Sequence, residues 1–319
     1  MCYSAQILAD YRRYVRMFGA HMDIAEFARL YFLQAEGHTA KTPKALDDSF
    51  RNPQNDGELE IWRLIEKTRA EQKTKFEQDL FKQRTRLTEA GRKLESKVTK
   101  AATESRRIAT DKIEAALRRI EDINRTEPKP RDSRIFPGNY APVLAVEGGQ
   151  RVVLPMRYQC RIAGNPANYD VRFPNTYNCR RDNLEGFWKP CFGHTHGIMV
   201  VDVFYENVSK AKAEGRTLAA GEKDENLIVE FRPEDGKPML IACLWSRWTA
   251  PGQEDLLSFA AITDEPPPEV AAAGHDRCII PIKPENVEAW LNPDPRELAS
   301  LYAILDDRHR PYYEHRLAA

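Results

Sequence analysis

The chain has 319 residues, enough for one large or two ordinary domains with a buried core. Lysine plus arginine and aspartate plus glutamate both number 48, so the formal charge is zero, which excludes a histone-like polycation and an acidic disordered chain. With 42% apolar and 30% charged residues, and no apolar run near the roughly 20 residues that span a bilayer, we expect no membrane association.

The first residues, MCYSAQIL, lack the apolar run and the small-residue cleavage site of a secretory signal, so we expect a cytoplasmic protein. Its six cysteines are scattered, with no C-x-x-C pair, which favours reduced thiols over a disulfide framework. We expect residues 1–6 to form an N-terminal segment of the core.

Apolar residues recur at helical spacing through residues 5–36, which predicts two short helices separated near Gly19. The Pro-, Asn- and Gly-containing stretch 38–57 is typical of a loop. We therefore expect residues 7–57 to form helices and a loop that pack on the core.

Residues 58–125 predict an inserted helical arm or hairpin, because residues 58–124 contain no proline, a single glycine and many charges. Leu80, Leu87 and Leu94 recur every seven residues, but polar neighbours keep this seam narrow. If the arm is a hairpin, Gly91 is the expected turn. A solvated spacer and a docking arm for a protein partner both remain open.

After a proline-bearing connector, residues 126–319 contain short apolar, β-branched runs that predict strands. Too little helix separates them for repeated βαβ units, so an antiparallel, barrel-like sheet is expected, closed by helices at 284–291 and 295–306. The predicted fold class is α+β, a β-rich core with flanking helices and the inserted arm. The expected strands are 143–146, 152–154, 198–203, 227–231, 239–244, 259–262 and 279–282.

Cys2 would become the N-terminal residue if Met1 were removed, which creates a 1,2-aminothiol. Reference pKa values of about 7.7 for the amine and about 8.5 for the thiol make both groups nucleophilic near neutral pH. An aldehyde that meets this pair forms a Schiff base with the amine and then a thiazolidine with the sulfur.

A basic stretch between Arg151 and Arg181 interleaves arginines with aromatic rings, the combination that binds phosphates and stacks bases in single-stranded nucleic acid. An ordinary sheet with exposed arginines is the alternative. The candidate DNA-binding residues here are Arg157, Tyr158, Arg172, Arg180 and Arg181.

Glu206 ends an apolar run and His275 stands at a turn before another, so these two side chains are candidates for sharing proton transfers at a carbonyl. Cys191-x-x-His194-x-His196 suggests zinc but lacks a fourth ligand at a familiar spacing. No phosphate-binding glycine loop is present, so we expect no cofactor and no metal.

Five short motifs stand in the order Met-Cys2, Asn139-Tyr-Ala-Pro, Asn178-Cys-Arg180, Phe204-Tyr-Glu206 and His275-Asp-Arg277. In this order they resemble the SOS response-associated peptidase family, whose members process abasic sites and crosslink to DNA. The resemblance covers the first six residues and residues 136–319.

The resemblance implies a DNA groove in which Cys2 attacks the open sugar aldehyde of an abasic site in single-stranded DNA. It implies that Asn178 holds the amine or the linkage, that Glu206 transfers protons, and that His275 assists formation and reversal of the crosslink. It also implies that Arg180 binds a phosphate and that Asn139 belongs to the DNA-binding set. A bacterial member would be nucleoid-associated.

The chain departs from the family pattern at Tyr3-Ser4, where Gly-Arg is usual, and at Asn207, where a tryptophan is usual. A tryptophan-rich segment is replaced near Met156–Cys160. Two other interpretations compete with crosslinking: an N-terminal-nucleophile protease or amidase built on Cys2, with self-removal of Met1, and a non-enzymatic scaffold that presents the arm.

Overall fold

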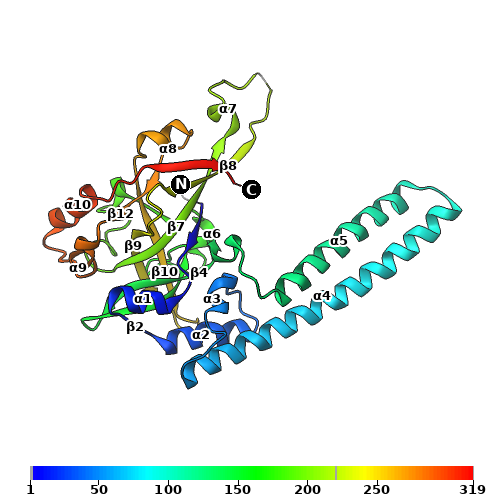
Figure 1. Cartoon of the computed structure of the whole chain (residues 1–319), viewed down its shortest axis with the longest axis horizontal. Helices are drawn as coiled ribbons and strands as arrows, with labels where there is room; N and C mark the ends of the chain where they lie inside the picture. The colour runs from blue at the N-terminus through cyan, green and yellow to red at the C-terminus, as the bar shows by residue number, and fades with distance from the viewer. Residues whose placement is uncertain (1–2, 220, 319) are drawn as a thin grey trace. The chain divides into compact units, whose positions relative to one another are not determined.

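The computed structural model describes residues 3–219 and 221–318 and has an α+β fold (Figure 1). It divides into two compact units. The first comprises Met1–Leu30, Thr39–Asn52 and Pro130–Ala319, and the second comprises Tyr31–His38 and Pro53–Lys129. The predicted α+β class is confirmed.

The first unit is organised around one sheet, within which β7 is the central strand. It pairs with β1, β4, β8 and β9, and almost every residue of β7 is buried. The described strands are β1 (Ser4–Ile7), β2 (His21–Met22), β3 (Arg134–Ile135), β4 (Tyr140–Glu147), β5 (Gln150–Tyr158), β6 (Asn178–Arg180), β7 (His196–Ser209), β8 (Asn226–Pro233), β9 (Met239–Trp248), β10 (Leu256–Asp264), β11 (Cys278–Ile279), β12 (Pro281–Ile282) and β13 (Tyr313–Leu317).

The strand path β9-β10-β5-β4-β7 returns to β9, because β7 also pairs with β9, so these strands form a ring. Most neighbours are antiparallel, as predicted. Three pairs are parallel, namely β10 with β5, β10 with β6 and β2 with β5, so the sheet is mixed. Each predicted run of the core forms strand, although the run 279–282 is divided between β11 and β12.

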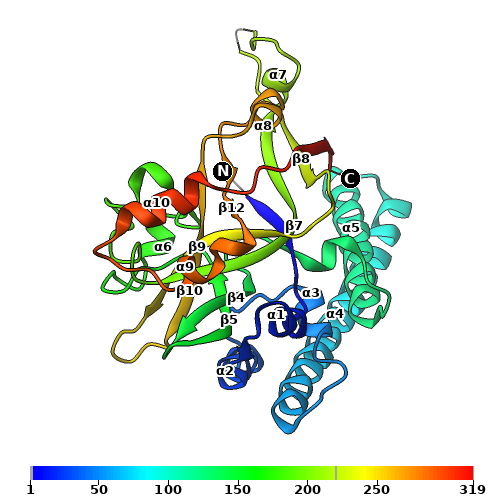
Figure 2. The ribbon, with the colours of Figure 1, turned by 60° about the vertical axis from the view of Figure 1, so that its left-hand side comes forward.

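The chain enters this sheet through β1, which lies between β7 and β3. Figure 2 shows β1 beside β7. Ile7 therefore belongs to a strand, and the prediction of helix this early was wrong because pairing with β7 outweighs the local helical spacing. The first helix begins at Tyr11, where the Asp10 side chain accepts a hydrogen bond from the Arg12 amide at 2.9 Å. It ends at Gly19, whose left-handed conformation confirms the expected break.

Short helices complete the first unit, and α2 runs from it into the second. The described helices outside the arm are α1 (Tyr11–Phe18), α2 (Ile24–Ala35), α3 (Lys44–Asp48), α6 (Tyr169–Arg172), α7 (Lys210–Ala213), α8 (Pro268–Ala272), α9 (Val287–Leu291) and α10 (Leu298–Asp306), with 3-10 turns at Pro130–Ser133, Arg181–Asn183 and Pro284–Asn286.

The second unit is a hairpin of two long helices, α4 (Asp56–Ser96) and α5 (Lys100–Asn124). The turn lies at residues 97–99 and not at Gly91, which stays inside α4. Thr99 caps α5 by accepting a hydrogen bond from the Ala102 amide at 3.2 Å, and Lys97 leaves the helical conformation. A side-chain cap and an extended residue therefore determine the turn, since glycine alone does not end a helix.

No described helix is long and apolar enough to cross a membrane.

Candidate functional site

Glu206 is a carboxyl group buried inside the sheet. It lies near the end of β7, opposite Val229 of β8, and its side chain is 0% exposed. Burial raises the pKa of Glu206 to about 8, although a hydrogen bond from the Tyr3 backbone acts in the opposite direction. At neutral pH this side chain is therefore a carboxylic acid that can donate a proton.

His275 meets Glu206 from a turn that follows α8. Its Nε2 atom lies 3.3 Å from the Glu206 Oε2 atom, and its side chain is 8% exposed. The Nδ1 atom lies 2.8 Å from the Arg277 carbonyl oxygen, which favours the tautomer that carries its proton on Nδ1 and leaves Nε2 as an acceptor. Burial lowers the pKa of His275 below its ordinary value of 6.5, so at neutral pH the imidazole is neutral while the Glu206 carboxyl is protonated.

The turn that carries His275 depends on Gly274. Its φ of +96° suits glycine, and a Cβ atom there would lie 2.8 Å from the Val208 Cγ1 atom of β7. The glycine therefore allows the turn to approach the strand that holds Glu206.

Tyr3 and Ser4, the first residues that the structure describes, lie beside the Glu206–His275 pair. In the antiparallel ladder of β1 and β7, Ser4 is opposite Tyr205, and the Tyr3 backbone bonds to Glu206. Cys2 itself lies outside the described residues. Tyr3, the residue that follows it in the sequence, is thus placed at the buried carboxyl.

Asn178 is a third buried polar side chain, on β6. Its Oδ1 atom accepts a hydrogen bond of 3.5 Å from the Tyr158 hydroxyl. Its Nδ2 atom is buried without a hydrogen-bond partner among the described residues. An unsatisfied buried donor costs about 1–3 kcal/mol, so this amide is suited to holding an acceptor atom. Tyr177 and Arg180, close to it in the sequence, line the cavity beside His275.

A cavity of about 460 Å³ opens beside His275. Arg180, Lys212 and Arg277 line it, together with Tyr3 and the single acid Asp276 among its charged residues. The three cations favour an anionic ligand such as a phosphate. Arg180 is exposed, and its Nε atom donates to Asp182 at 2.9 Å, an exchangeable surface pair.

Two exposed aromatic rings, Tyr3 and Phe136, form a pair that the sequence analysis missed. Their side chains are 42% and 37% exposed, and their ring centroids lie 5.7 Å apart in an edge-to-face arrangement. The Arg134 guanidinium lies 5.1 Å from the centroid of Phe136 and donates to Ser4 Oγ. The available signal in the sequence was Tyr3-Ser4 itself, which departs from the family pattern. The ring pair joins residues 133 positions apart, and the Arg134–Ser4 hydrogen bond joins residues 130 positions apart.

The structure disperses the predicted basic stretch. Arg157 pairs with Asp170 at 2.6 Å, and Arg172 stays exposed, with its guanidinium 5.9 Å from the Phe173 ring centroid. Tyr158 is 1% exposed, so its ring lies in the core and is not presented to a base. The predicted surface therefore does not include Tyr158, because this ring packs against Tyr177 and Phe259 at the end of a strand that is buried through most of its length.

Asn139 has a local role in the structure. Its side-chain oxygen accepts a hydrogen bond from the Phe136 amide at 2.7 Å. It therefore shapes the turn that presents Phe136.

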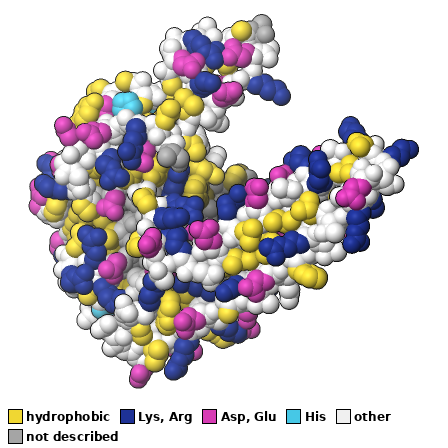
Figure 3. All heavy atoms as spheres, turned by 45° about the vertical axis from the view of Figure 1, so that its right-hand side comes forward, with side chains coloured by type: hydrophobic (Ala, Val, Ile, Leu, Met, Phe, Trp, Pro, Cys, Tyr) yellow, Lys and Arg dark blue, Asp and Glu magenta, His cyan; other side chains and the backbone are white. Residues whose placement is uncertain are grey.

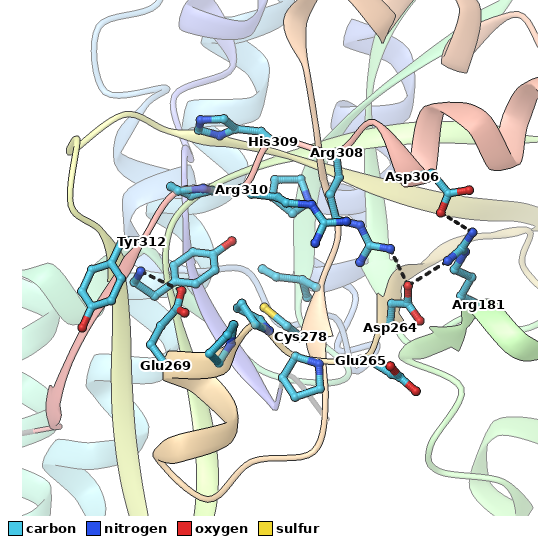
Figure 4. A pocket seen from close by; sticks show the side chains of 17 residues that line it. Arg181, Asp264, Glu265, Glu269, Cys278, Asp306, Arg308, His309, Arg310 and Tyr312 are labelled. Atoms are coloured by element: carbon cyan, nitrogen blue, oxygen red, sulfur yellow. Dashed lines mark hydrogen bonds and ion pairs between the residues drawn. The ribbon is translucent and has the colours of Figure 1, made fainter.

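A second cavity, of about 570 Å³, lies by Arg181 and Arg308 (Figure 4). Both arginines bind the Asp264 carboxylate, and Arg181 also pairs with Asp306 at 2.5 Å. Arg181, Arg308, Asp264 and Asp306 pair with one another, whereas Arg180, Lys212 and Arg277 outnumber the acidic residues among those described in the lining beside His275. We therefore place the site at the smaller cavity, and Arg181 in a structural ion-pair network.

His196, from the suggested zinc motif, is a core residue. Its Nε2 atom accepts a hydrogen bond from the Gly193 amide at 2.9 Å, and its ring packs on Trp290. Burial lowers the pKa of His196 to about 3, so it is a neutral acceptor. Among the described residues, no three His, Cys, Asp or Glu side chains lie close enough together to hold a metal ion.

The fold and the site define an α+β protein with a buried acid–imidazole pair beside a cationic cavity. Residues 98–316 match the family model described as SOS response associated peptidase (SRAP). The chain belongs to this family, and the resemblance seen in the motifs is confirmed.

Three solved structures are similar to the chain. A protein from Bordetella bronchiseptica has 17% identity and a TM-score of 0.45, over 59% of this chain and 87% of its own. A Bacteroides thetaiotaomicron protein has 15% identity and a TM-score of 0.44, over 59% and 78%. A phage-related Bordetella bronchiseptica protein has 18% identity and a TM-score of 0.43, over 61% and 84%. No curated protein sequence matches the chain.

Proposed function

We propose that the chain crosslinks covalently, through Cys2, to abasic sites in single-stranded DNA. The observation that carries the proposal is the Glu206–His275 pair beside Tyr3, the residue that follows Cys2. A sugar aldehyde needs both an acid and a base near the nucleophile, and this pair supplies both at neutral pH.

The reaction begins with ring opening of the abasic sugar, in which the protonated Glu206 carboxyl donates to the ring oxygen and His275 Nε2 accepts the hydroxyl proton. The free α-amine of Cys2 then adds to the aldehyde carbon, and one water leaves to give a Schiff base. The thiolate adds to the imine carbon while the nitrogen takes up a proton. The product is a thiazolidine, formed with net loss of one water.

Asn178 is proposed to hold the amine or the linkage, because its Nδ2 atom has no hydrogen-bond partner among the described residues. Arg180, with Lys212 and Arg277, is proposed to bind phosphates that flank the site, since these residues line the cavity. The exposed rings of Tyr3 and Phe136 are proposed to stack on the neighbouring base in place of the missing tryptophans. Such a protein would act in the cytoplasm, wherever its DNA is exposed.

A second candidate function is an N-terminal-nucleophile peptidase, favoured by the family description and by the same Glu206–His275 pair. In this reaction the Cys2 thiolate would attack an acyl carbon, with removal of Met1 as its simplest form. The two functions share residues but differ in substrate.

The experiment that tests the proposal mixes the purified chain with a single-stranded oligonucleotide containing one abasic site. We expect a heat-stable adduct on a denaturing gel, and none with Cys2→Ser, because a hydroxyl is a far weaker nucleophile than a thiolate. Intact mass should show that Met1 is absent from the reactive protein. Turnover of a peptide substrate with no DNA adduct would instead support the peptidase.

A further inference from the structure

The turn end of the helical hairpin, residues 82–107, carries a concentrated positive charge, and we name it the hairpin tip. It holds nine Lys and Arg against three Glu, whereas the flanking residues 53–81 and 108–129 hold ten Lys and Arg against twelve Asp and Glu. The nine cations are Lys82, Arg84, Arg86, Arg92, Lys93, Lys97, Lys100, Arg106 and Arg107. Charge is therefore segregated along the hairpin, although the whole chain is neutral.

Most of these cations are available to a ligand. Arg86 donates to Ser105 at 2.9 Å, and Arg107 pairs with Glu104 and Asp111. The other seven are exposed, and no carboxylate pairs with them in the described part of the chain. Figure 3 shows Lys and Arg side chains gathered at the far end of the hairpin, with few acidic ones among them.

The hairpin holds the tip on a stiff support. Ala102, Ala109 and Ala116 are buried at intervals of seven residues and allow α5 to pack closely on α4, and the Arg86–Ser105 hydrogen bond links the two helices near the turn. The 41 residues of α4 extend over about 60 Å at 1.5 Å per residue. A rigid support lowers the entropy lost when several cations bind one ligand.

The ligand that fits such a surface is a polyanion with many phosphates. Surfaces that bind single strands combine cations with several aromatic rings, whereas residues 82–107 contain no aromatic residue and one exposed ring, Phe81, borders them. We propose that the hairpin tip binds the sugar-phosphate backbone of duplex DNA, without preference for sequence. This interaction is separate from the crosslinking chemistry and does not depend on it.

The test compares two full-length variants that lose the same number of charges. The tip variant replaces Lys82, Arg84, Arg92, Lys93 and Lys100 with Gln, and the control variant replaces Arg63, Lys67, Lys75, Lys112 and Arg118 with Gln. All ten side chains are exposed. Affinity for an undamaged 40-base-pair duplex, and for a single strand of equal length, is measured over a range of salt concentrations, with helicity and thermal unfolding as controls for folding.

We expect the tip variant to bind duplex at least about tenfold more weakly near 100 mM salt. The slope of log affinity against log salt concentration should fall in magnitude by about 2–4, since each phosphate contact contributes about 0.9 to it. The control variant should stay within about twofold of the unmodified chain. Adduct formation on a ten-nucleotide abasic strand should not change in either variant, which separates this proposal from the proposed function.

Three results would overturn the inference. These are equal losses in the two variants, unchanged duplex binding in the tip variant, or a loss confined to the single strand. Equal losses would mean that only the net charge of the chain matters. Unchanged duplex binding would mean that the tip does not bind DNA and would favour a protein partner.

Discussion

The Oε2 atom of Glu206 lies 3.3 Å from the Nε2 atom of His275, with both side chains withdrawn from solvent. Burial is the largest cause of both pKa shifts, upward for Glu206, to about 8, and downward for His275. Near neutral pH the two residues are therefore a carboxylic acid and a neutral imidazole in close contact, and not an ion pair. A neutral pair avoids the cost of burying two charges and can pass a proton in either direction.

The first prediction is that Glu206→Gln reduces the dependence of stability on pH. In the folded chain the pKa of Glu206 lies near 8, above its ordinary value of 4.5, so the folded state holds a proton that the unfolded state has lost between these values. The free energy of unfolding should therefore fall as pH rises from about 4.5 to about 8, by on the order of 5 kcal/mol at most.

Urea unfolding at pH 6 and pH 9 checks this prediction. The unmodified chain should lose more stability between these pH values than Glu206→Gln, which cannot ionise. Parallel losses in the two proteins would show that the Glu206 carboxyl is ionised in the folded state at both pH values.

The second prediction concerns the glycine that places His275. Gly274→Ala should destabilise the fold by about 1–3 kcal/mol, because it adds a strained φ and a Cβ atom in contact with Val208. It should also slow adduct formation at temperatures where the variant stays folded, since His275 would be displaced from Glu206.

Gly252→Ala is the matched control for this prediction. Gly252 also has a positive φ, of +68°, but its added Cβ atom would meet nothing within 4 Å. The control should lose stability through backbone strain and keep its adduct rate. A Gly274→Ala variant with an unchanged rate would count against a role for the position of His275.

The third prediction separates two adjacent arginines. Arg180→Ala should weaken binding to single-stranded DNA. It should also reduce the slope of log affinity against log salt concentration by about 0.7, the contribution of one phosphate contact. Arg181→Ala should instead lower stability with little effect on the salt slope, because Arg181 is paired with Asp264 and Asp306. Titrations over salt concentration and thermal unfolding distinguish the two outcomes, and a flattened slope for Arg181→Ala alone would reverse the assignment.

The strands of the core could be predicted from the sequence because buried strands are short, apolar and β-branched, as in β7 and β9. Glu206 and His275 could be singled out because Glu206 ends such a run and His275 stands at a turn just before another. Their 3.3 Å contact could not be predicted, since it joins residues 69 positions apart through the packing of a turn on β7.

The basic stretch shows why composition alone misleads. Arg157 and Arg161 both bind one buried acid, Asp170, at 2.6 Å and 2.7 Å, a pairing that depends on how α6 folds back on β5. In the arm, the turn at residues 97–99 follows from the cap at Thr99, a weaker sequence signal than the glycine at position 91. Tertiary contacts and side-chain caps decided these cases.

The last prediction separates Glu206 from His275 in the proposed crosslinking reaction. Ring opening needs acid assistance, which typically contributes about 10²- to 10⁴-fold. Glu206→Gln should therefore slow adduct formation while DNA affinity is retained, and a substrate whose sugar is already open should partly restore the rate. The unmodified rate should fall as pH rises through about 8, where the Glu206 carboxyl loses its proton. His275→Gln should slow both the formation and the reversal of the adduct, because the imidazole Nε2 accepts a proton in one direction and returns it in the other. Two time courses decide this, one following the appearance of the adduct and one following its loss to an excess of fresh abasic DNA. Unchanged rates in both variants would remove the pair from the reaction, even if Cys2 proved essential.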